Sequence, residues 1–494
     1  MIYKSKTDAF FNSDLIIKAR SFFISRTFMI LTALLGAIFI FFQAEVLGVA
    51  LLVLLMSLLL VVCDDVLSTT LPFLILCVSV LQCYDSFDTF IKFVWLAPIP
   101  VAAVLFHFIY YRKKIRIGNS FFGLLAVGVA VTFGGLGTIS AKEYFAGISL
   151  YYVAALGFGM AGAYLLIRSQ IQTRTDYDIR EKFVDIMYIM GMFTCFQMLE
   201  IYYETVPSSL ISFTGFVENP INTSFSKMLR FIFLLEENLE IRCHLQPGNN
   251  VSTFIMIALP FPMYRALKSQ KHVAKLHLLS VALMAFCMFI SKSRGGLVMG
   301  AVAIMLCFVA AFIYEKNIVW KILFITVPLA ALTVAIWHIV EKGINNVYES
   351  VLQDKIVSTD EPRMKLLTRS FEDFLQNPVF GQGIGNVSNA DLYAGKKGTI
   401  TWYHMMIPQI YGSMGSVGIL AYAYQFFGRV MLTLKKRSLF VITVALSYGG
   451  LFLMSQVNPG EFCPIPYGLI AVILFIMIEN EPDFLKKPKK VESA

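Results

Sequence analysis

Long apolar runs with almost no charge occupy most of this chain, and they constrain its fold more than any other feature. Residues 295–314 contain no Asp, Glu, Lys or Arg, and residues 319–340 contain a single lysine. A run of about 16–25 residues is enough for a helix to cross the ~30 Å hydrocarbon core of a bilayer. About fourteen such runs predict an all-α polytopic membrane protein with about 12–14 transmembrane helices.

The composition excludes the other broad classes of protein. Hydrophobic residues make up 57% of the chain and charged residues 15%, with a mean hydropathy of +0.70, whereas a soluble domain has roughly 25% charged residues. A soluble enzyme, a disordered chain, a coiled coil and a fibre are therefore excluded. The net charge of +9 indicates cytoplasmic Lys and Arg, and not a nucleic-acid partner, because no basic and aromatic patch lies on a soluble segment.

The distribution of basic residues predicts the orientation. Basic segments such as 112–116, 435–437 and 486–490 alternate with less basic connections, as the positive-inside rule requires. This pattern predicts an even number of spans with both termini in the cytoplasm. No cleavable signal peptide precedes the first span, so we expect that span to direct insertion itself.

Two long connections are expected to lie outside the cell, and they divide the chain. Both are rich in charge and in Asn, Pro and Gly, and long translocated loops are exempt from the charge rule. Loops of this length are usually functional. The predicted organisation is a cytoplasmic N-terminus (1–24), an N-terminal helical bundle (25–202), an outer loop (203–249), central helices (250–340), a large outer loop (341–402), C-terminal helices (403–479) and a basic cytoplasmic tail (480–494).

The first candidate site is the turn Ser293-Arg294-Gly295-Gly296 between two spans. An arginine at the membrane boundary costs free energy unless it is paired or hydrated. The following helix start presents unpaired N–H groups that favour an anion. Arg294 therefore predicts a phosphate site, and an interfacial turn with a snorkelling arginine is the alternative.

A second candidate precedes the next helix start on the outer side. Arg242 is followed by Pro247-Gly248 and by Asn249-Asn250. This combination of an arginine, a turn and a polar helix start fits either a ligand role or an ordinary helix cap.

The third candidate lies in the large outer loop. Apolar residues recur at helical spacing over 363–376 and predict an amphipathic surface helix. Arg363 opens this helix and Arg369 falls on its polar face, so each either binds a ligand or is simply solvated. The stretch after Asn377 contains Gly381 and Gly383 and predicts a tight turn with accessible backbone amides. It follows no βαβ unit, so a dinucleotide site is rejected.

The fourth candidate is His404, at the outer start of a span that continues through Gly412, Gly415 and Gly418. The three glycines make one small face against which another helix can pack closely. A histidine at the positive end of a helix is biased towards its neutral form and can accept a proton or donate a hydrogen bond. The alternative is an interfacial histidine in an aromatic belt beside Trp402 and Tyr403.

Taken in order, these motifs resemble the O-antigen ligase and Wzy-type polysaccharide polymerase superfamily over residues of about 240–425. The matching elements are Arg242 with Pro247 and Asn249 or Asn250, Ser293-Arg294-Gly295, Arg363 through Asn377-Pro378-Val379-Phe380-Gly381-Gln382-Gly383, and His404 with Gly415 and Gly418. Met405 departs from the Asn, Ser or Gln that the ligases usually carry after the histidine. A polymerase is therefore the closer fit.

The resemblance implies a GT-C-like, inverting and metal-independent glycosyltransferase that needs no cofactor. Such an enzyme polymerises or ligates oligosaccharide units carried on undecaprenyl diphosphate, at the outer face of the bacterial cytoplasmic membrane, in surface-polysaccharide, O-antigen or capsule biosynthesis. Its implied partners are the lipid-linked glycan donor, a glycan acceptor, membrane lipid, a flippase and a chain-length regulator.

The resemblance also implies roles for single residues. Arg242 and Arg294 would bind the diphosphate, joined by Arg363 and, more weakly, by Arg369. His404 would be either the base or another phosphate donor, and Asn377, Gly381 and Gly383 would help to bind the substrate. Alternative bases are Glu218, Glu236 and Glu237.

Other functions remain open at this point. A lipid-glycan flippase would need cations inside a central cavity, and a secondary transporter would need acids at mid-membrane, for which Asp185 is the nearest candidate. A peptidoglycan polymerase would need a catalytic acid in a long outer loop. No HExxH or Walker A motif occurs, and the long outer loops contain no DxD, so neither a metal site nor ATP is expected.

Overall fold

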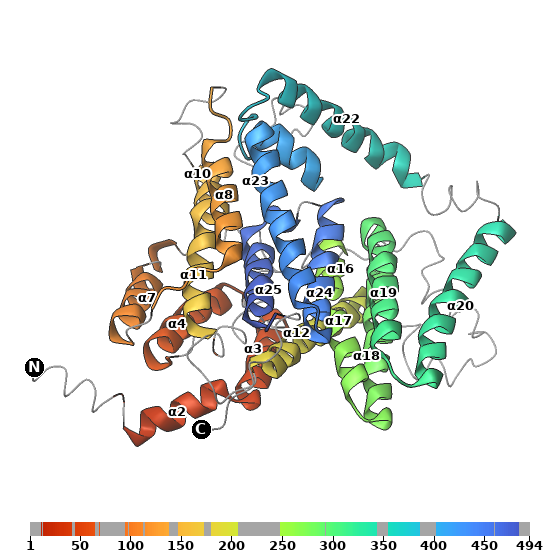
Figure 1. Cartoon of the computed structure of the whole chain (residues 1–494), viewed down its shortest axis with the longest axis horizontal. Coiled ribbons are helices and arrows are strands. Elements are labelled where there is room, and N and C mark those ends of the chain that lie inside the picture. Colours follow the sequence, from red (N-terminus) through yellow and green to blue (C-terminus); the bar gives the residue numbers. More distant parts are fainter. Residues whose placement is uncertain are drawn as a thin grey trace, which may run out of the picture. The chain divides into compact units, whose positions relative to one another are not determined.

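The computed structural model shown in Figure 1 is helical throughout the part of the chain that it describes. The described residues are 11, 13–41, 45–64, 69, 94–96, 98–111, 114–137, 147–171, 179–205, 248–291, 293–342, 354–385, 402–458 and 460–483. These residues contain no strand, which confirms the predicted all-α class.

Two compact units divide the chain, and each is described by itself. Unit 1 comprises Met1–Lys114 and Thr173–Ala301, and unit 2 comprises Ile115–Gln172 and Val302–Ala494. The helices of unit 1 are α2 (Asp14–Ile24), α3 (Arg26–Phe41), α4 (Glu45–Val62), η1 (Val94–Leu96), α7 (Pro98–Tyr110), α12 (Ile179–Thr205), α16 (Gly248–Ala258), α17 (Pro260–Lys268), α18 (Lys271–Ile290) and the start of α19 (Arg294–Tyr314). Unit 2 contains the rest of α19, α8 (Asn119–Phe133), α10 (Gly147–Tyr152), η2 (Val153–Gly159), α11 (Met160–Ile171), α20 (Ile318–Lys342), α22 (Asp354–Gln376), α23 (Met406–Lys436), α24 (Leu439–Ser455), η5 (Gly460–Phe462), η6 (Pro464–Gly468) and α25 (Leu469–Asn480).

Several of these helices can cross a membrane. Five are long and apolar enough: Leu150–Ser169, Ile179–Leu199, Lys271–Ile290, Gly295–Tyr314 and Met406–Lys436. The pair Asp14–Ile24 and Arg26–Gly36, bent by 67°, makes up to six, and further apolar helices of 10–17 residues occur. A multi-pass membrane protein is thereby confirmed. The expected 12–14 spans include stretches outside the described residues, such as 70–83, so that number stays a prediction.

The exposed surface of these helices is apolar. Leu420 on α23 is 70% exposed and Val319 on α20 is 69% exposed. Soluble proteins rarely expose large contiguous apolar patches, whereas hydrocarbon chains solvate such side chains without cost. The apolar surface is therefore the surface expected to face lipid.

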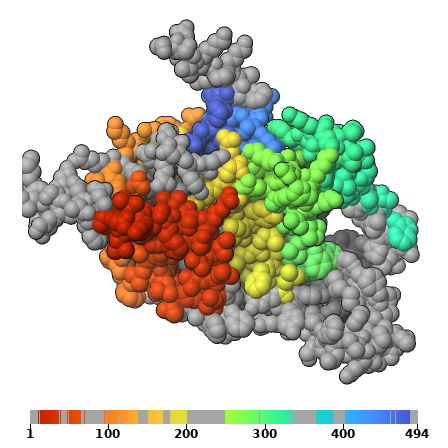
Figure 2. All heavy atoms as spheres, turned by 90° about the horizontal axis from the view of Figure 1, so that it is seen from below, coloured from red at the N-terminus to blue at the C-terminus, as the bar shows by residue number. Residues whose placement is uncertain are grey.

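Unit 1 is built from packed helix pairs. Its helix α4 packs against α7, α12 against α16, and α17 against α18. Figure 2 shows the N-terminal helices in red, gathered on one face. In the same unit Arg265 pairs with both Glu181 and Asp185, and Arg26 reaches Asp185 at 2.9 Å. Asp185 is thus held by two arginines, which weakens its candidacy as an ion-coordinating acid.

Unit 2 is organised around α23. Its helix α8 packs against both α23 and the π-helical η2, while α22 also contacts α23 and α11 contacts α25. The helix backbones approach closely where side chains are missing, since a Cβ added to Gly128 would lie 2.5 Å from the Gly157 carbonyl oxygen. Contacts with α8, α22, α24 and α25 position α23, which carries the most specific sequence motif.

A buried ion pair lies inside unit 2. In the structure α23 continues to Lys436, and Arg429 Nη1 lies 2.5 Å from Glu461 Oε1 with both side chains buried. A buried charge inside a helix is tolerated when a partner compensates it.

Two aromatic residues complete this site. Arg429 Nη1 donates to the Tyr448 hydroxyl at 2.5 Å, and the guanidinium lies 4.7 Å from the ring centroids of both Tyr448 and Phe475. Tyr448 in turn donates to Glu461 Oε2 at 3.1 Å. Cation–π contacts of this kind gain strength when the cation is desolvated.

We expect Glu461→Gln to destabilise the protein by about 3–5 kcal/mol, because it leaves the buried Arg429 without a counter-charge. Thermal unfolding in detergent, followed by circular dichroism, measures the loss. Replacing both residues with apolar ones, Arg429→Met with Glu461→Leu, should recover most of it. The matched control is Glu372→Gln, which breaks a more exposed pair with Arg369 and should cost at most about 1 kcal/mol. Equal losses of unfolding free energy in Glu461→Gln and Glu372→Gln would show that the Arg429–Glu461 pair is not a buried ion pair on which the fold depends.

Candidate functional site

A break in α23 is the centre of the candidate site. Gly415 lies within this helix but has φ 59° and ψ −152°, so the helical path is interrupted there. A non-glycine residue rarely adopts this conformation. The break removes regular i to i−4 hydrogen bonds, and backbone groups buried in this way need other partners.

The turn after α22 supplies those partners. Four backbone hydrogen bonds connect it to α23: Gln382 N to Gly412 O (2.8 Å), Gly383 N to Ser413 O (2.9 Å), Ser416 N to Pro378 O (2.8 Å) and Val417 N to Val379 O (3.2 Å). We refer to residues 377–383 with 412–417 as the motif interlock. The two most specific motifs of the sequence are therefore one hydrogen-bonded structure.

The glycines of the motif interlock allow two backbones to touch. A Cβ on Gly381 would lie 2.4 Å from the carbonyl carbon of Ser413, and a Cβ on Gly415 would lie 2.5 Å from that of Val379. The N–H of Gly381 donates to Asn377 O at 2.8 Å. The expectation of accessible amides in this turn is thus wrong for Gly381, Gln382 and Gly383, whose amides are all used within the protein.

The predicted glycine face of α23 also meets different neighbours than expected. The Gly412 side faces the ring of Tyr403, where a Cβ would come within 2.7 Å of Cε2, and Gly415 faces the turn. A Cβ on Gly418 would meet Met414 of its own helix. These glycines therefore do not form a surface for another helix, because the turn and Tyr403 occupy the space.

A third segment joins the motif interlock from the end of α8. The Asn377 side chain donates from Nδ2 to Leu136 O at 3.0 Å, and Gly135 N donates to Phe380 O at 2.9 Å. The family resemblance implies a substrate-binding role for Asn377. In the structure its side chain ties the turn to residues 134–137, which sequence reasoning did not include although three glycines there mark a turn.

His404 lies two residues before α23, as the sequence predicted, and it has an unusual backbone. Its φ is 55°, in the left-handed region that only a few per cent of non-glycine residues occupy. Such strain persists only where the surroundings impose it, and it is common at functional sites. The side chain is half-buried.

Tyr403 is the anchor beside His404. It is fully buried, its hydroxyl donates to Asp373 Oδ2 at 2.6 Å, and its N–H donates to Gln409 Oε1 at 3.0 Å. Burial, and next the hydrogen bond to Asp373, raise the pKa of Tyr403 far above its usual value, so the phenol stays a donor. Sequence reasoning placed Tyr403 only in an aromatic belt and did not single out Asp373, whose pairing with Tyr403 and Arg369 no local pattern shows.

Arg369 acts on the other side of Asp373. Its Nε lies 3.2 Å from Asp373 Oδ1, and its Nη1 lies 3.0 Å from Glu372 Oε2. The predicted surface helix is present, but α22 begins at Asp354, so the expectation that Arg363 opens it is wrong. Residues 354–362 extend the helix towards its N-terminus, although they show little of the apolar periodicity on which the prediction was based.

In unit 1, the Ser293-Arg294-Gly295-Gly296 turn is tied to α16. The Ser293 hydroxyl donates to the Asn249 side-chain oxygen and accepts from Gly296 N at 2.9 Å, which caps the start of α19. A Cβ on Gly296 would lie 2.5 Å from Ser252 Cβ. Arg294 is thus the first residue of α19, at the positive end of the helix dipole.

Other candidates fall outside what the structure describes. These are Arg242, the alternative bases Glu218, Glu236 and Glu237, and the side chains of Arg294 and Arg363. Among the described residues, no group of three His, Cys, Asp or Glu side chains is arranged to hold a metal ion.

The fold and these motifs define a polytopic α-helical membrane protein whose specific motifs lie in its C-terminal half. Residues 279–423 match the family model described as O-antigen ligase. The matched segment contains Arg294, the motif interlock and His404, and it confirms the resemblance to the O-antigen ligase and Wzy-type superfamily. The match supports a membrane enzyme of O-antigen or polysaccharide assembly. No curated protein and no solved structure matches the chain.

We expect Gly415→Ala to destabilise the protein by at least about 1–3 kcal/mol, because its backbone conformation is essentially restricted to glycine and a Cβ would collide with residue 379. The matched control is Gly449→Ala in α24, where a Cβ meets no atom within 4 Å; it should be neutral or stabilising, since alanine favours a helix. Thermal unfolding in detergent distinguishes the two. A Gly415→Ala protein as stable as the control would show that the motif interlock does not require glycine at position 415.

Proposed function

We propose that this protein is a membrane glycosyltransferase that polymerises polyprenyl-diphosphate-linked oligosaccharide units at the outer face of the bacterial cytoplasmic membrane. The observation that carries the proposal is the family match, which spans the Ser293-Arg294 helix start, the motif interlock and His404. Ligation of the glycan to a lipid core is the second form of the same reaction. Met405 in place of a polar residue favours the polymerase.

The proposed reaction is an inverting substitution at the anomeric carbon of the donor sugar. An acceptor hydroxyl oxygen forms the new C–O bond while the bond from the anomeric carbon to the diphosphate oxygen breaks. The hydroxyl proton passes to a base, and the polyprenyl diphosphate leaves with the bonding electrons. Charge develops on the leaving diphosphate, so preorganised cations at that position stabilise the transition state.

Arg294 is the residue that we assign to the diphosphate in unit 1. It is the first residue of α19, whose N-terminal N–H groups and dipole favour an anion. Its guanidinium fork matches phosphate oxygens in a bidentate manner. Arg242 and Arg363 are proposed to add further contacts to the donor. Gly296 removes the side chain that would displace Ser252, so this helix start keeps its cap.

His404 is the residue that we assign to the reaction in unit 2, as the acceptor base or as a donor to phosphate. The support is its strained backbone together with the buried Tyr403 anchor. Arg369 is proposed to contribute through Asp373, since its guanidinium already engages two carboxylates. Asn377, Gly381 and Gly383 are proposed to shape the substrate site by holding the turn of the motif interlock in place.

The proposal includes cellular context. Both termini are proposed to lie in the cytoplasm, a flippase would supply the lipid-linked donor, and a chain-length regulator would limit the polymer. Transport is the less favoured function, because the one acid considered for ion coordination, Asp185, is paired with Arg265 and Arg26.

We expect Arg294→Ala to abolish polymer formation from a purified lipid-linked donor while the protein still inserts and folds. Arg294→Lys should restore only part of the activity, because a point charge cannot make the bidentate contact. Arg116→Ala, which removes an exposed arginine from unit 2, is the control and should leave activity unchanged. Full polymer formation by Arg294→Ala would remove this residue from the mechanism.

We expect substitution of His404 to separate its two candidate roles. A general base contributes about 10²–10⁴-fold in rate, so His404→Ala and His404→Gln should both lose that factor in kcat. A phosphate donor would instead let His404→Gln, which retains an N–H, keep near-normal turnover. Both variants keep a Cβ at the positive φ, so backbone strain is the same in each. Normal kcat and KM in His404→Ala would show that the histidine has no part in the reaction.

A further inference from the structure

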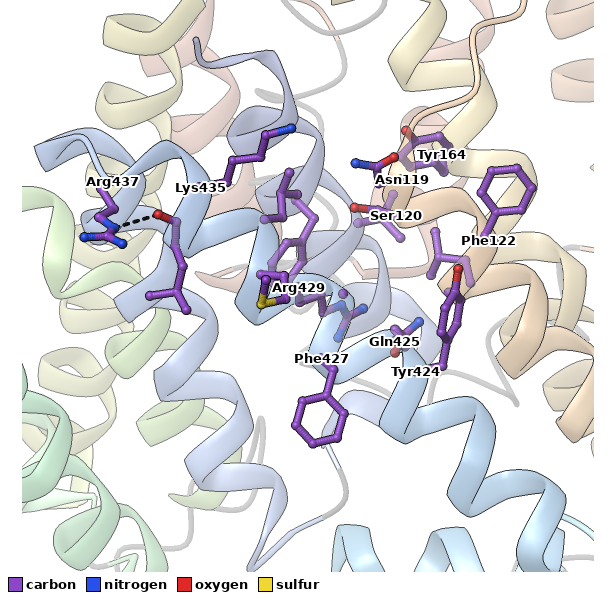
Figure 3. Close-up of a pocket in the computed structure, with 18 residues that line it drawn as sticks. Asn119, Ser120, Phe122, Tyr164, Tyr424, Gln425, Phe427, Arg429, Lys435 and Arg437 are labelled. Carbon is purple, nitrogen blue, oxygen red and sulfur yellow. Dashed lines mark hydrogen bonds between the residues drawn. The ribbon is translucent and has the colours of Figure 1, made fainter. Parts of the chain in front are cut away.

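A second site lies in unit 2, along the part of α23 that follows the motif interlock. A cavity of about 660 Å³ is lined by residues of α8, α11, α23 and α25 and by Arg437 just after α23. Figure 3 shows it with Arg429 near its centre. Its α23 residues begin at Tyr424, nine positions after Gly415, which is roughly 14 Å along a helix. The cavity is therefore separate from the proposed reaction site, and the family motifs did not point to it.

The polar part of the cavity is cationic. Lys435, Arg437 and Arg429 line it, and the residues that line it include no acid. Asn119 and Ser120, the first two residues of α8, also line it. The Ser120 N–H donates to Glu479 Oε1 at 2.6 Å, so this carboxylate already compensates the start of α8. The positive charge available at the cavity is therefore that of the side chains. In Figure 3 Lys435, Asn119 and Ser120 lie in the upper part of the view.

The rest of the lining is apolar and reaches the lipid-facing surface. Phe427 and Tyr424 lie in the lower part of Figure 3, and both side chains are exposed, as is Met431. Leu124 and Val472 line the cavity from α8 and α25. An apolar body below a cationic end matches the division of a phospholipid into acyl chains and phosphate.

The cations at the rim are available to a ligand. Lys435 pairs with Asp483 at 3.3 Å, but the lysine side chain is 58% exposed, and such pairs contribute little. Arg437 Nε donates to Leu434 O at 2.7 Å, the bond drawn in Figure 3. Its terminal nitrogens have no acceptor among the described residues. Arg429, by contrast, is committed to Glu461.

We propose that this cavity binds one anionic phospholipid of the surrounding bilayer. Lys435 and Arg437 bind its phosphate, and an acyl chain follows Phe427 and Met431 towards the lipid-facing surface. Basic pockets between transmembrane helices bind anionic headgroups by this combination of charge and burial. The volume is within the range of sites that hold small molecules.

Native mass spectrometry of the full-length protein, purified in detergent and incubated with phosphatidylglycerol or phosphatidylcholine, tests the proposal. Wild-type protein should retain phosphatidylglycerol in preference to phosphatidylcholine. The double variant Lys435→Gln/Arg437→Gln should bind phosphatidylglycerol about ten- to thirtyfold more weakly, since each cation near an anionic lipid contributes a factor of about five. Equal retention of the two lipids by wild type would overturn the proposal.

A second variant tests the cavity without changing its charge. Gly428 lines it, and a Cβ there meets no atom within 4 Å, so Gly428→Phe fills the space and should also displace phosphatidylglycerol. The control Lys271→Gln/Lys275→Gln removes two exposed lysines from α18 in unit 1 and should bind as wild type. A matching loss in this control, or unchanged binding in Gly428→Phe, would refute this site. Thermal unfolding confirms that each variant is folded.

Discussion

The structure of unit 2 depends on how a broken helix satisfies its backbone. In a bilayer no water replaces a lost helical hydrogen bond, so a break is tolerated only where other protein groups pair with the freed N–H and C=O. At Gly415 those groups belong to the turn after α22. The turn, the end of α8 and the start of α23 therefore stabilise one another. Because His404 lies just before α23, these contacts also determine its position. The turn at 377–383 resembles a ligand-binding loop in sequence, but its backbone first of all provides hydrogen-bond partners for the broken helix α23.

The sequence predicted the features that follow from periodicity and hydropathy. The all-α fold, the surface helix before Asn377 and the position of His404 at a helix start were all indicated by short-range patterns. The sequence did not predict features that depend on a contact between residues far apart in the chain. Nothing local shows that Gly381 must lack a side chain because Ser413 lies against it, or that Arg429 can lie inside a helix because Glu461, 32 residues later, compensates it.

The candidate site shows a division between residues that touch a reactant and residues that hold others in place. Arg369 and Tyr403 both converge on Asp373, which has no exposed surface. Leaving a buried carboxylate with one partner fewer costs more free energy than a single hydrogen bond contributes, so the three side chains stabilise one conformation. That conformation fixes the backbone before His404, which explains how a non-glycine residue is kept at positive φ. Arg369 thus belongs to the support of the site, although its charge alone suggested a ligand contact.

The cations of the cavity in unit 2 also divide into one that belongs to the framework and others that are free to bind a ligand. Arg429 and Lys435 line one cavity, yet the two cations differ in burial: the Arg429 side chain is 7% exposed, whereas the Lys435 side chain is 58% exposed. Taking Arg429 from Glu461 would leave two uncompensated charges in a medium of low dielectric constant, which costs several kcal/mol. Exchanging Asp483 for a phosphate at Lys435 replaces one screened pair with another and costs little. A ligand that enters from the bilayer is therefore bound by the rim cations, while Arg429 remains part of the protein's framework.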